Sequence, residues 1–315
     1  MIEAYKQKID KLINNVERVF LGKTYAIQLC VAGILARGHI LIEDVPGMGK
    51  TTLAQVLARS MNCKFHRIQF TSDMLPSDIL GVSILNPKTA EFEFRRGPIF
   101  ANIVLADEIN RTPPKTQSAL LEAMSEYQVS MDSRTYGLPQ PFVVIATQNP
   151  IEYEGTYSLP ESQLDRFLIR LEIGYPPAEE ELVIMKKRDV VKEITELPPV
   201  LTAEEVLELQ ERTKGILVDE SISHYILQII EKTRTHEQVE LGISPRGTQS
   251  LYVASQAWAL IHGREFVTPQ DVREVAESVL AHRLITKTKS FNLTHLAEER
   301  KRIIQEILRT VPIPR

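Results

Sequence analysis

The sequence predicts an α/β domain built on a parallel five-stranded sheet, followed by an all-helical domain. An apolar run at 39–45 passes through a glycine-rich loop into a helical pattern, and a second strand is expected at 64–70. Strands joined through a helix in this way must run parallel. No strand pattern is recognisable after Tyr175-Pro176-Pro177. A chain of 315 residues is long enough for about two domains, and we predict them at 1–177 and 178–315.

Two helices are expected before the first strand. Apolar residues recur at helical spacing through 2–20, Gly22 ends that pattern, and 25–36 is almost wholly apolar. A helix that is apolar on several faces is normally buried, so we expect 25–36 to pack against the sheet. The five strands are expected at 39–45, 64–70, 101–107, 141–147 and 167–173.

An insertion interrupts the alternation of strands and helices. Residues 77–81 have the pattern of a short helical turn, and 82–85 and 91–94 flank a turn-rich loop, which predicts a hairpin. A helix is expected at 116–127, and a second hairpin around Asp132-Ser133-Arg134. The α/β domain is therefore larger than a minimal repeat of strands and helices.

Helix-start signals dominate the chain after residue 177. Thr202 and Glu205 have the spacing of a capping box, and Asp219 can cap a further helix. Ser244 and Thr268 are each followed by proline, which is favoured in the first turn of a helix. Only helices are therefore expected in this part of the chain.

Composition narrows the class of protein. The net charge is −4 with 25% charged residues and no Lys/Arg cluster, which argues against a nucleic-acid-binding surface. Cys30 and Cys63 lack metal-ligand spacing, so we expect reduced, buried thiols. The N-terminus does not resemble a signal peptide, and the chain has no apolar run of about 18 residues. We therefore expect a soluble, cytoplasmic protein without membrane insertion.

The glycine-rich loop has the chemistry of a nucleotide phosphate site. Its glycines let successive backbone N–H groups point inward, and the following helix presents its positive end to an anion. Lys50 can reach the β- and γ-phosphates, and the Thr51 hydroxyl can ligate Mg²⁺. The usual pattern has glycine where this chain has Asp44, and an ordinary glycine-rich turn is the alternative interpretation. The candidate residues are Pro46, Gly47, Met48, Gly49, Lys50, Thr51 and Thr52.

Asp107 and Glu108 end the apolar strand at 101–107 and are candidates for metal binding and catalysis. Adjacent strand residues project to different sides, so Asp107 is expected to hold Mg²⁺ through water, and Glu108 to orient or deprotonate the attacking water. Asn149, just after the next strand, is expected beside Glu108, where it can position that water. Alternatively, the carboxylates begin a solvated loop, and Asn149 forms a turn.

Two arginines are further candidates. Arg166 precedes the fifth strand and can project toward a neighbouring subunit, although an ion pair with Asp165 or Glu161 is the simpler interpretation. Arg246 lies in the first turn of an expected helix, an unfavourable place for a cation unless an anion is near. A γ-phosphate would supply that anion.

Long stretches of the chain resemble the AAA+ ATPases and, within them, the MoxR family. The similarity covers nearly the whole chain. Its most specific segments are LIEDVPGMGKT, MLPSDILG, ADEINRTPPKTQSALLEAM, ATQNPIEYEGTYSLPESQLDRF and GISPRGTQSLYVASQAWALIHGREFVTPQDV.

The resemblance implies an AAA+ αβα core with a helical lid, and ATP and Mg²⁺ as cofactors. It implies that Lys50 and Thr51 belong to Walker A, and Asp107 and Glu108 to Walker B. The resemblance further implies that residues near 19–22, Gly22 included, line the adenine pocket, and that the hairpin at 82–95 is the helix-2 insert. The remaining roles it implies are Asn149 as sensor 1, Arg166 as an arginine finger for the next subunit, and Arg246 as sensor 2.

The same resemblance implies a homo-oligomer, by analogy a hexamer. Its expected role is chaperone-like remodelling of protein clients or complexes, together with proteins that carry a von Willebrand A domain. Two other functions stay open at this point. One is an AAA+ motor or loader acting on nucleic acid, and the other is a nucleotide-gated scaffold with little turnover.

Overall fold

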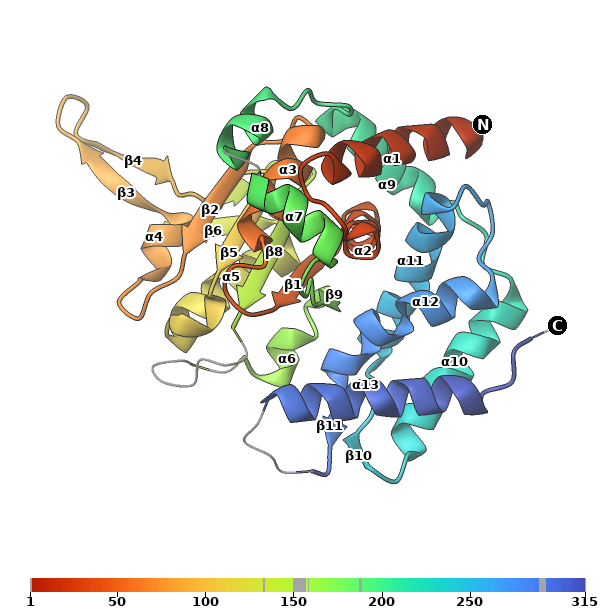
Figure 1. The fold of residues 1–315 in the computed structure, drawn as a ribbon. Helices are drawn as coiled ribbons and strands as arrows, with labels where there is room; N and C mark the ends of the chain where they lie inside the picture. Colours follow the sequence, from red (N-terminus) through yellow and green to blue (C-terminus); the bar gives the residue numbers. More distant parts are fainter. Residues whose placement is uncertain are drawn as a thin grey trace.

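The fold combines a parallel sheet covered by helices with a separate group of helices on one side of it (Figure 1). The computed structural model describes residues 2–132, 134–149, 157, 159–186, 189–288 and 293–314. In Figure 1 the helical group lies beyond one edge of the sheet, and a hairpin projects on the opposite side.

The central sheet contains all five expected strands in parallel, in the order β2-β5-β8-β1-β9. Because the strands are parallel, their carboxyl ends share one edge and their amino ends share the other. Loops that follow different strands therefore meet at one edge. The strands are β1 (His39–Glu43), β2 (Phe65–Gln69), β5 (Ile103–Asp107), β8 (Val143–Gln148) and β9 (Phe167–Leu171).

Helices cover both faces of the sheet, because its inner strands are apolar on both sides. Ile40 and Ile42 of β1 belong to one buried cluster, and Leu41 between them belongs to the other. As expected, α2 packs against the sheet, and it also contacts α11 of the helical group. The helices of this part are α1 (Ile2–Glu17), α2 (Thr24–Leu35), α3 (Lys50–Ser60), α4 (Pro76–Leu80), α5 (Pro114–Glu126) and α6 (Glu161–Leu164).

Both expected hairpins are present. The insertion forms β3 (Gly81–Asn86) and β4 (Glu91–Arg96), and the second hairpin forms β6 (Gln128–Met131) and β7 (Arg134–Gly137). The Ser83 hydroxyl donates a hydrogen bond to Asp132, which joins the two hairpins. The turn residue Ser133 lies outside the described residues, as do 150–156 and 158 of the segment quoted above.

The helical part begins with the caps that the sequence predicted. Thr202 accepts a hydrogen bond from the backbone N–H of Glu205, and Asp219, Ser244 and Thr268 cap the next three helices in the same way. We propose residue 177 as the boundary, since β9 ends at Leu171 and α7 begins at Ala178. The helices after this boundary are α7 (Ala178–Lys186), α8 (Val190–Glu196), α9 (Ala203–Lys214), α10 (Glu220–Thr235), α11 (Pro245–Ile261), α12 (Pro269–Leu280) and α13 (Leu293–Thr310), with a 3₁₀ turn at Ala281–Arg283.

The expectation of a purely helical second part was wrong. β10 (Val239–Leu241) pairs in antiparallel orientation with β11 (Ile285–Thr286). These strands contain three and two residues, too few for an alternating pattern to be recognised in the sequence. Their pairing depends on a contact between segments that are far apart in the chain.

Candidate functional site

The phosphate loop lies between β1 and α3, at the carboxyl edge of the sheet. Gly47 and Gly49 adopt φ of +88° and +80°, a backbone conformation that other residues rarely adopt. A Cβ on Gly49 would also lie 2.9 Å from Phe20 Cε2. α3 begins at Lys50, so Lys50 and Thr51 both lie in its first turn.

The Lys50 ammonium folds back across the loop. It donates hydrogen bonds to the carbonyl oxygens of Asp44, at 2.5 Å, and Val45, at 3.3 Å. These contacts keep a positive charge beside the N-terminus of α3, where the helix dipole also favours anions. The arrangement is suited to binding a polyphosphate.

Asp107 is held by groups from both neighbouring strands. Its Oδ1 accepts a hydrogen bond from the Thr147 hydroxyl at 2.6 Å, and its Oδ2 forms an ion pair with Arg67 Nη2 at 2.6 Å. The Asp107 side chain is 11% exposed. An ionised carboxylate has about four acceptor positions. Arg67 Nε also bonds to Oδ2, so three positions are used and one remains on Oδ1.

The oxygen donors at this edge fit Mg²⁺. This ion takes one or two protein oxygen ligands and completes its shell with water and phosphate oxygens. The Thr51 hydroxyl and the free acceptor position of Asp107 provide such a set. Within the part of the chain that the structure describes, no group of three or more His, Cys, Asp or Glu side chains is arranged to hold a metal. The described residues thus favour a site that nucleotide phosphates complete.

Glu108 lies at the same edge, for a different reason from the one expected. β5 ends at Asp107, and Glu108 adopts a left-handed conformation with φ 59° and ψ 49°. Strand alternation therefore does not separate the two carboxylates; a sharp turn does. A left-handed residue other than glycine costs roughly 1–2 kcal/mol. The backbone N–H of Glu108 donates to Thr147 Oγ1 at 2.9 Å, which helps to hold this turn.

The Glu108 carboxylate is held from two sides. Glu108 Oε2 accepts hydrogen bonds from Gln69 Nε2 at 2.8 Å and from Arg111 Nη1 at 3.0 Å. The Glu108 side chain is 23% exposed, so it is partly shielded but still accessible to water. A carboxylate in such a position can orient a water molecule.

The strand order brings Asn149 to this group. β8 lies between β5 and β1, and Asn149 follows its last residue. Asn149 is 5% exposed, which is unusual for a residue that merely forms a surface turn. Its position lies between the strand that leads to Glu108 and the strand that leads to the phosphate loop.

A cavity of about 330 Å³ adjoins the phosphate loop. Its lining combines residues 19–21, 47–49 and 173–176 with apolar side chains from α7 and α8. Gly22 is not in the lining. It turns the chain with φ +70°, and a Cβ there would lie 2.9 Å from Pro177 Cδ. The cavity has the apolar character of a nucleobase pocket.

Arg166 lies at the opposite edge of the sheet. It precedes Phe167, the first residue of β9, and Phe167 pairs with His39 at the start of β1. Because β1 has five residues, this edge lies roughly 17 Å from the phosphate loop. Arg166 Nη1 donates to Leu121 O at 2.6 Å and Ser125 Oγ at 2.8 Å. Among the described residues, Arg166 forms no ion pair with Asp165 or Glu161, the two alternative partners; Asp165 pairs with Arg283 at 2.7 Å.

Arg246 lies at the same edge as Arg166. It is exposed in the first turn of α11, whose cap Ser244 donates to Asp165 Oδ2 at 3.3 Å. Its positive charge also acts on His39 at the start of β1. Burial lowers the pKa of His39 to about 4, and Arg246 adds to that decrease. A phosphate bound in the loop of the same chain is therefore on the far side of the sheet from Arg246.

Three contacting residues were absent from the sequence-based candidates. Thr147 joins Asp107 to Glu108, Arg67 pairs with Asp107, and Gln69 contacts Glu108. Thr147 and Gln69 lie at or near the carboxyl ends of β8 and β2, and Arg67 lies in the middle of β2. A polar residue at the end of an otherwise apolar strand is the signal that could have identified Thr147.

None of the helices in the described ranges is both long enough and apolar enough to span a bilayer.

Comparisons with known proteins complete the description of the site. Residues 39–169 match the family model described as "ATPase family associated with various cellular activities (AAA)", and residues 231–307 match that of the AAA lid domain. The first match includes the phosphate loop, Asp107, Glu108, Asn149 and Arg166. The second includes Arg246.

Relatives match the chain over nearly its whole length. YeaC of Bacillus subtilis is 49% identical over 306 residues, covering 97% of this chain and 95% of the relative. Chaperone MoxR1 of Mycobacterium tuberculosis is 40% identical over 328 residues, covering 99% and 84%. Protein MoxR of Paracoccus denitrificans is 30% identical over 325 residues, covering 94% and 93%. A solved structure of a protein from Cytophaga hutchinsonii superposes with a TM-score of 0.88 at 39% identity, covering 100% of this chain and 97% of that one.

Proposed function

Because the chain belongs to the MoxR family of AAA+ ATPases, we propose that it hydrolyses ATP at sites shared between neighbouring subunits of a ring. The observation that carries this proposal is the distribution of the site residues over two edges of one sheet. Lys50 and Glu108 lie at the carboxyl edge, whereas Arg166 and Arg246 lie at the amino edge. Each chain therefore contributes to two sites. It supplies the phosphate-binding half of one site and the arginine half of the neighbouring site.

At the carboxyl edge, the proposed binding steps use the phosphate loop. Its backbone N–H groups and the Lys50 ammonium hold the β- and γ-phosphates, and the cavity at residues 19–21 and 173–176 takes the base. The Thr51 hydroxyl and Asp107 hold Mg²⁺ with the phosphate oxygens. When bound, Mg²⁺ neutralises charge that develops on these oxygens during phosphoryl transfer.

The proposed chemical step uses Glu108 and Asn149. Glu108 accepts a proton from the attacking water or orients it, and its contacts with Gln69 and Arg111 fix the direction of the carboxylate. Asn149 donates to the same water or to the γ-phosphate. The left-handed backbone of Glu108 supports this role, since strained residues concentrate where function requires a particular geometry.

The amino edge of a neighbouring subunit completes the site. Head-to-tail contact between identical subunits joins two different surfaces, and such contacts form a ring when the rotation between subunits closes. Arg166 is then the finger that stabilises charge on the transferred phosphoryl group, and Arg246 is a second cation directed at the same nucleotide. We propose a hexamer, by analogy with the family. In this arrangement Arg246 senses the nucleotide bound by the neighbouring subunit. The γ-phosphate of that nucleotide is the anion expected near Arg246.

We further propose that ATP turnover drives remodelling of protein clients or complexes. The relative named Chaperone MoxR1 supports this role, as does the helical lid, whose angle can follow the nucleotide state. Proteins with a von Willebrand A domain are the proposed partners by family analogy. A nucleic-acid motor is less well supported, because the net charge is −4 and the sequence contains no basic cluster.

Steady-state ATP hydrolysis, measured as a function of protein concentration, tests this proposal. Light scattering on the same samples gives the mass with ATP and with ADP. A rate per subunit that rises with concentration, together with ATP-dependent assembly, supports a shared site. A constant rate from a persistent monomer contradicts it.

A further inference from the structure

Asp44 is the position where this phosphate loop departs from the general glycine pattern, and its side chain has a defined set of contacts. Asp44 Oδ2 accepts hydrogen bonds from the backbone N–H groups of Ile173, at 2.8 Å, and Gly174, at 2.7 Å. Its Oδ1 accepts from Val45 N at 2.8 Å. The carbonyl oxygen of the same residue accepts from Lys50 Nζ at 2.5 Å. Asp44 is thus bonded both to the loop and to a segment about 130 residues away in sequence.

The distant segment is the other wall of the base cavity. Ile173 and Gly174 follow β9 and line that cavity together with Met48 and Gly49 of the phosphate loop. Gly174 adopts φ +66°, so the chain turns sharply where Asp44 holds it. The carboxylate of Asp44 therefore bridges the wall that faces the phosphates and the wall that faces the base.

A glycine at position 44 could not make this bridge. It would leave the N–H groups of Ile173 and Gly174 without the carboxylate, and a half-buried N–H without a partner is costly. We propose that Asp44 is a positioning residue that sets the separation between the phosphate loop and the base-binding wall, and thereby the affinity for the base end of the nucleotide. This inference rests on the proposed function, since it assumes that the cavity takes a nucleotide.

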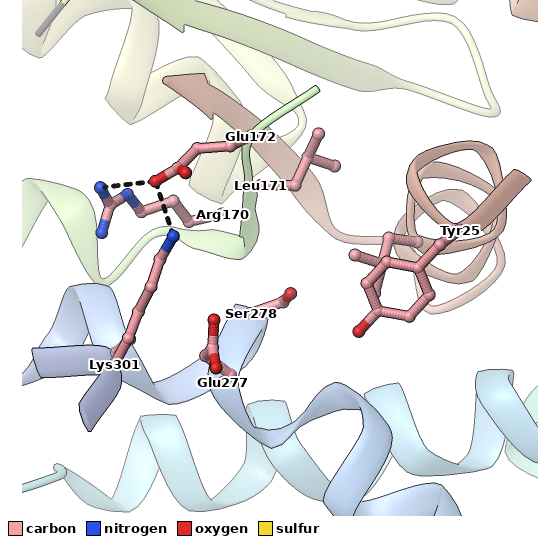
Figure 2. A pocket seen from close by; sticks show the side chains of 9 residues that line it. Tyr25, Arg170, Leu171, Glu172, Glu277, Ser278 and Lys301 are labelled. Atoms are coloured by element: carbon pink, nitrogen blue, oxygen red, sulfur yellow. Dashed lines mark hydrogen bonds and ion pairs between the residues drawn. The ribbon is translucent and has the colours of Figure 1, made fainter. Parts of the chain in front are cut away.

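The segment held by Asp44 is also anchored to the lid. Glu43, the neighbour of Asp44, pairs with Arg170 at 2.5 Å, and Lys301 of α13 pairs with Glu172 at 2.8 Å. Figure 2 shows Arg170, Glu172 and Lys301 gathered at one side of a small cavity, with Tyr25 across it. The Arg170 side chain is 8% exposed, so its ion pair with Glu43 is well shielded from solvent.

These contacts also connect the phosphate loop to the lid. Asp44 accepts hydrogen bonds from Ile173 and Gly174. That segment continues from Glu172, which Lys301 holds against α13. A series of contacts within a single chain therefore links the phosphate loop, through Asp44, to α13 of the lid.

The test compares two ligands in the variants Asp44→Asn and Asp44→Gly. ADP with Mg²⁺ uses both walls of the cavity, whereas tripolyphosphate with Mg²⁺ uses only the phosphate loop. Asp44→Asn keeps an oxygen for Val45 but replaces one carboxylate oxygen with an amide that cannot accept. Isothermal titration should show ADP binding weakened about tenfold, equivalent to about 1.4 kcal/mol. Tripolyphosphate should bind as in the wild type or more tightly, because a negative charge near an anion site is removed.

Two further measurements make the test specific. Without nucleotide, hydrogen exchange at the amides of Ile173 and Gly174 should be faster in both variants than in the wild type. This measurement detects the loss of the Asp44 hydrogen bonds independently of nucleotide affinity. Asp219→Asn is the matched control, since Asp219 also accepts from a backbone N–H, that of Ser221 at 2.9 Å, but at the start of α10. It should leave both affinities unchanged.

The possible results separate the two proposals. Unchanged ADP affinity in both Asp44 variants would overturn the inference, and so would equal losses for ADP and tripolyphosphate, which indicate a collapsed loop. Wild-type protein that binds tripolyphosphate but not ADP would also overturn it. Wild-type protein that binds neither ligand would instead refute the proposed function.

Discussion

Mixing two inactive variants gives the sharpest test of a site shared between subunits. Lys50→Ala removes the phosphate-binding ammonium, and Arg166→Ala removes the proposed finger. Each variant alone should be inactive, since loss of an arginine finger typically costs about 10³ to 10⁵ in rate. The structure places the two side chains at opposite edges of the sheet. A single chain therefore cannot bring its own Arg166 to its own Lys50.

The expected recovery follows from this geometry. In an equimolar mixture that assembles at random, an active site needs a Lys50-intact subunit beside an Arg166-intact neighbour. Each condition is met half of the time, so about one quarter of the wild-type rate per subunit should return in a head-to-tail ring. The assay is steady-state phosphate release after the variants are mixed as monomers and assembled with ATP.

A second mixture is the control. Lys50 and Glu108 lie at the same edge of one chain, so Lys50→Ala mixed with Glu108→Gln should recover no activity. Recovery near one quarter in this control would show that Lys50 and Glu108 of one active site can come from different chains. That result would contradict the proposed arrangement. No recovery in the Lys50→Ala and Arg166→Ala mixture, with assembly confirmed by light scattering, would refute the shared site.

Three further predictions concern single side chains. The variant Glu108→Gln should bind ATP as tightly as the wild type in equilibrium binding, but its kcat for phosphate release should be lower by a factor of about 10² to 10⁴. Full turnover would exclude Glu108 as the catalytic carboxylate. Thr147→Val should preserve shape but remove the bonds to Asp107 and Glu108, lowering the free energy of unfolding by about 1–3 kcal/mol in urea; an unchanged midpoint would contradict that role. Burial lowers the pKa of His39 to about 4 from its usual 6.5, so between these pH values the folded state binds fewer protons than the unfolded state. The free energy of unfolding should therefore fall by about 1.4 kcal/mol per pH unit as the pH drops from 6.5 to about 4. His39→Gln should reduce that slope, and an NMR titration of His39 near 6.5 in the folded protein would refute the reasoning.

Local sequence determined the features whose atoms lie close together in the chain. The phosphate loop is built from backbone N–H groups of consecutive residues, so its glycines, Lys50 and Thr51 are recognisable without a structure. The same holds for the helix caps at Thr202 and Thr268, where a side chain bonds to a backbone group three residues later. Four of the five strands were predictable because strands buried on both faces appear as short, continuous apolar runs.

Only the tertiary structure decided how these pieces meet. The order β2-β5-β8-β1-β9 places Asn149 between the strands that lead to Glu108 and to the phosphate loop, and nothing in the spacing of these residues encodes that order. The left-handed turn at Glu108 depends on Thr147, 39 residues later. Asp44 lies next to the loop in sequence, but the backbone it holds at Gly174 is 130 residues away.

The direction of the strands decided the most important functional point. The sequence by itself identified Arg166 and Arg246 as candidates, and a resemblance suggested their roles. Their common place at the amino edge, away from the phosphate loop of the same chain, follows from the parallel pairing of β9 with β1 and from the contact of Ser244 with Asp165. Consecutive residues specify local chemistry, whereas the edge of the sheet at which a side chain lies depends on pairing between distant segments, which only the folded chain establishes.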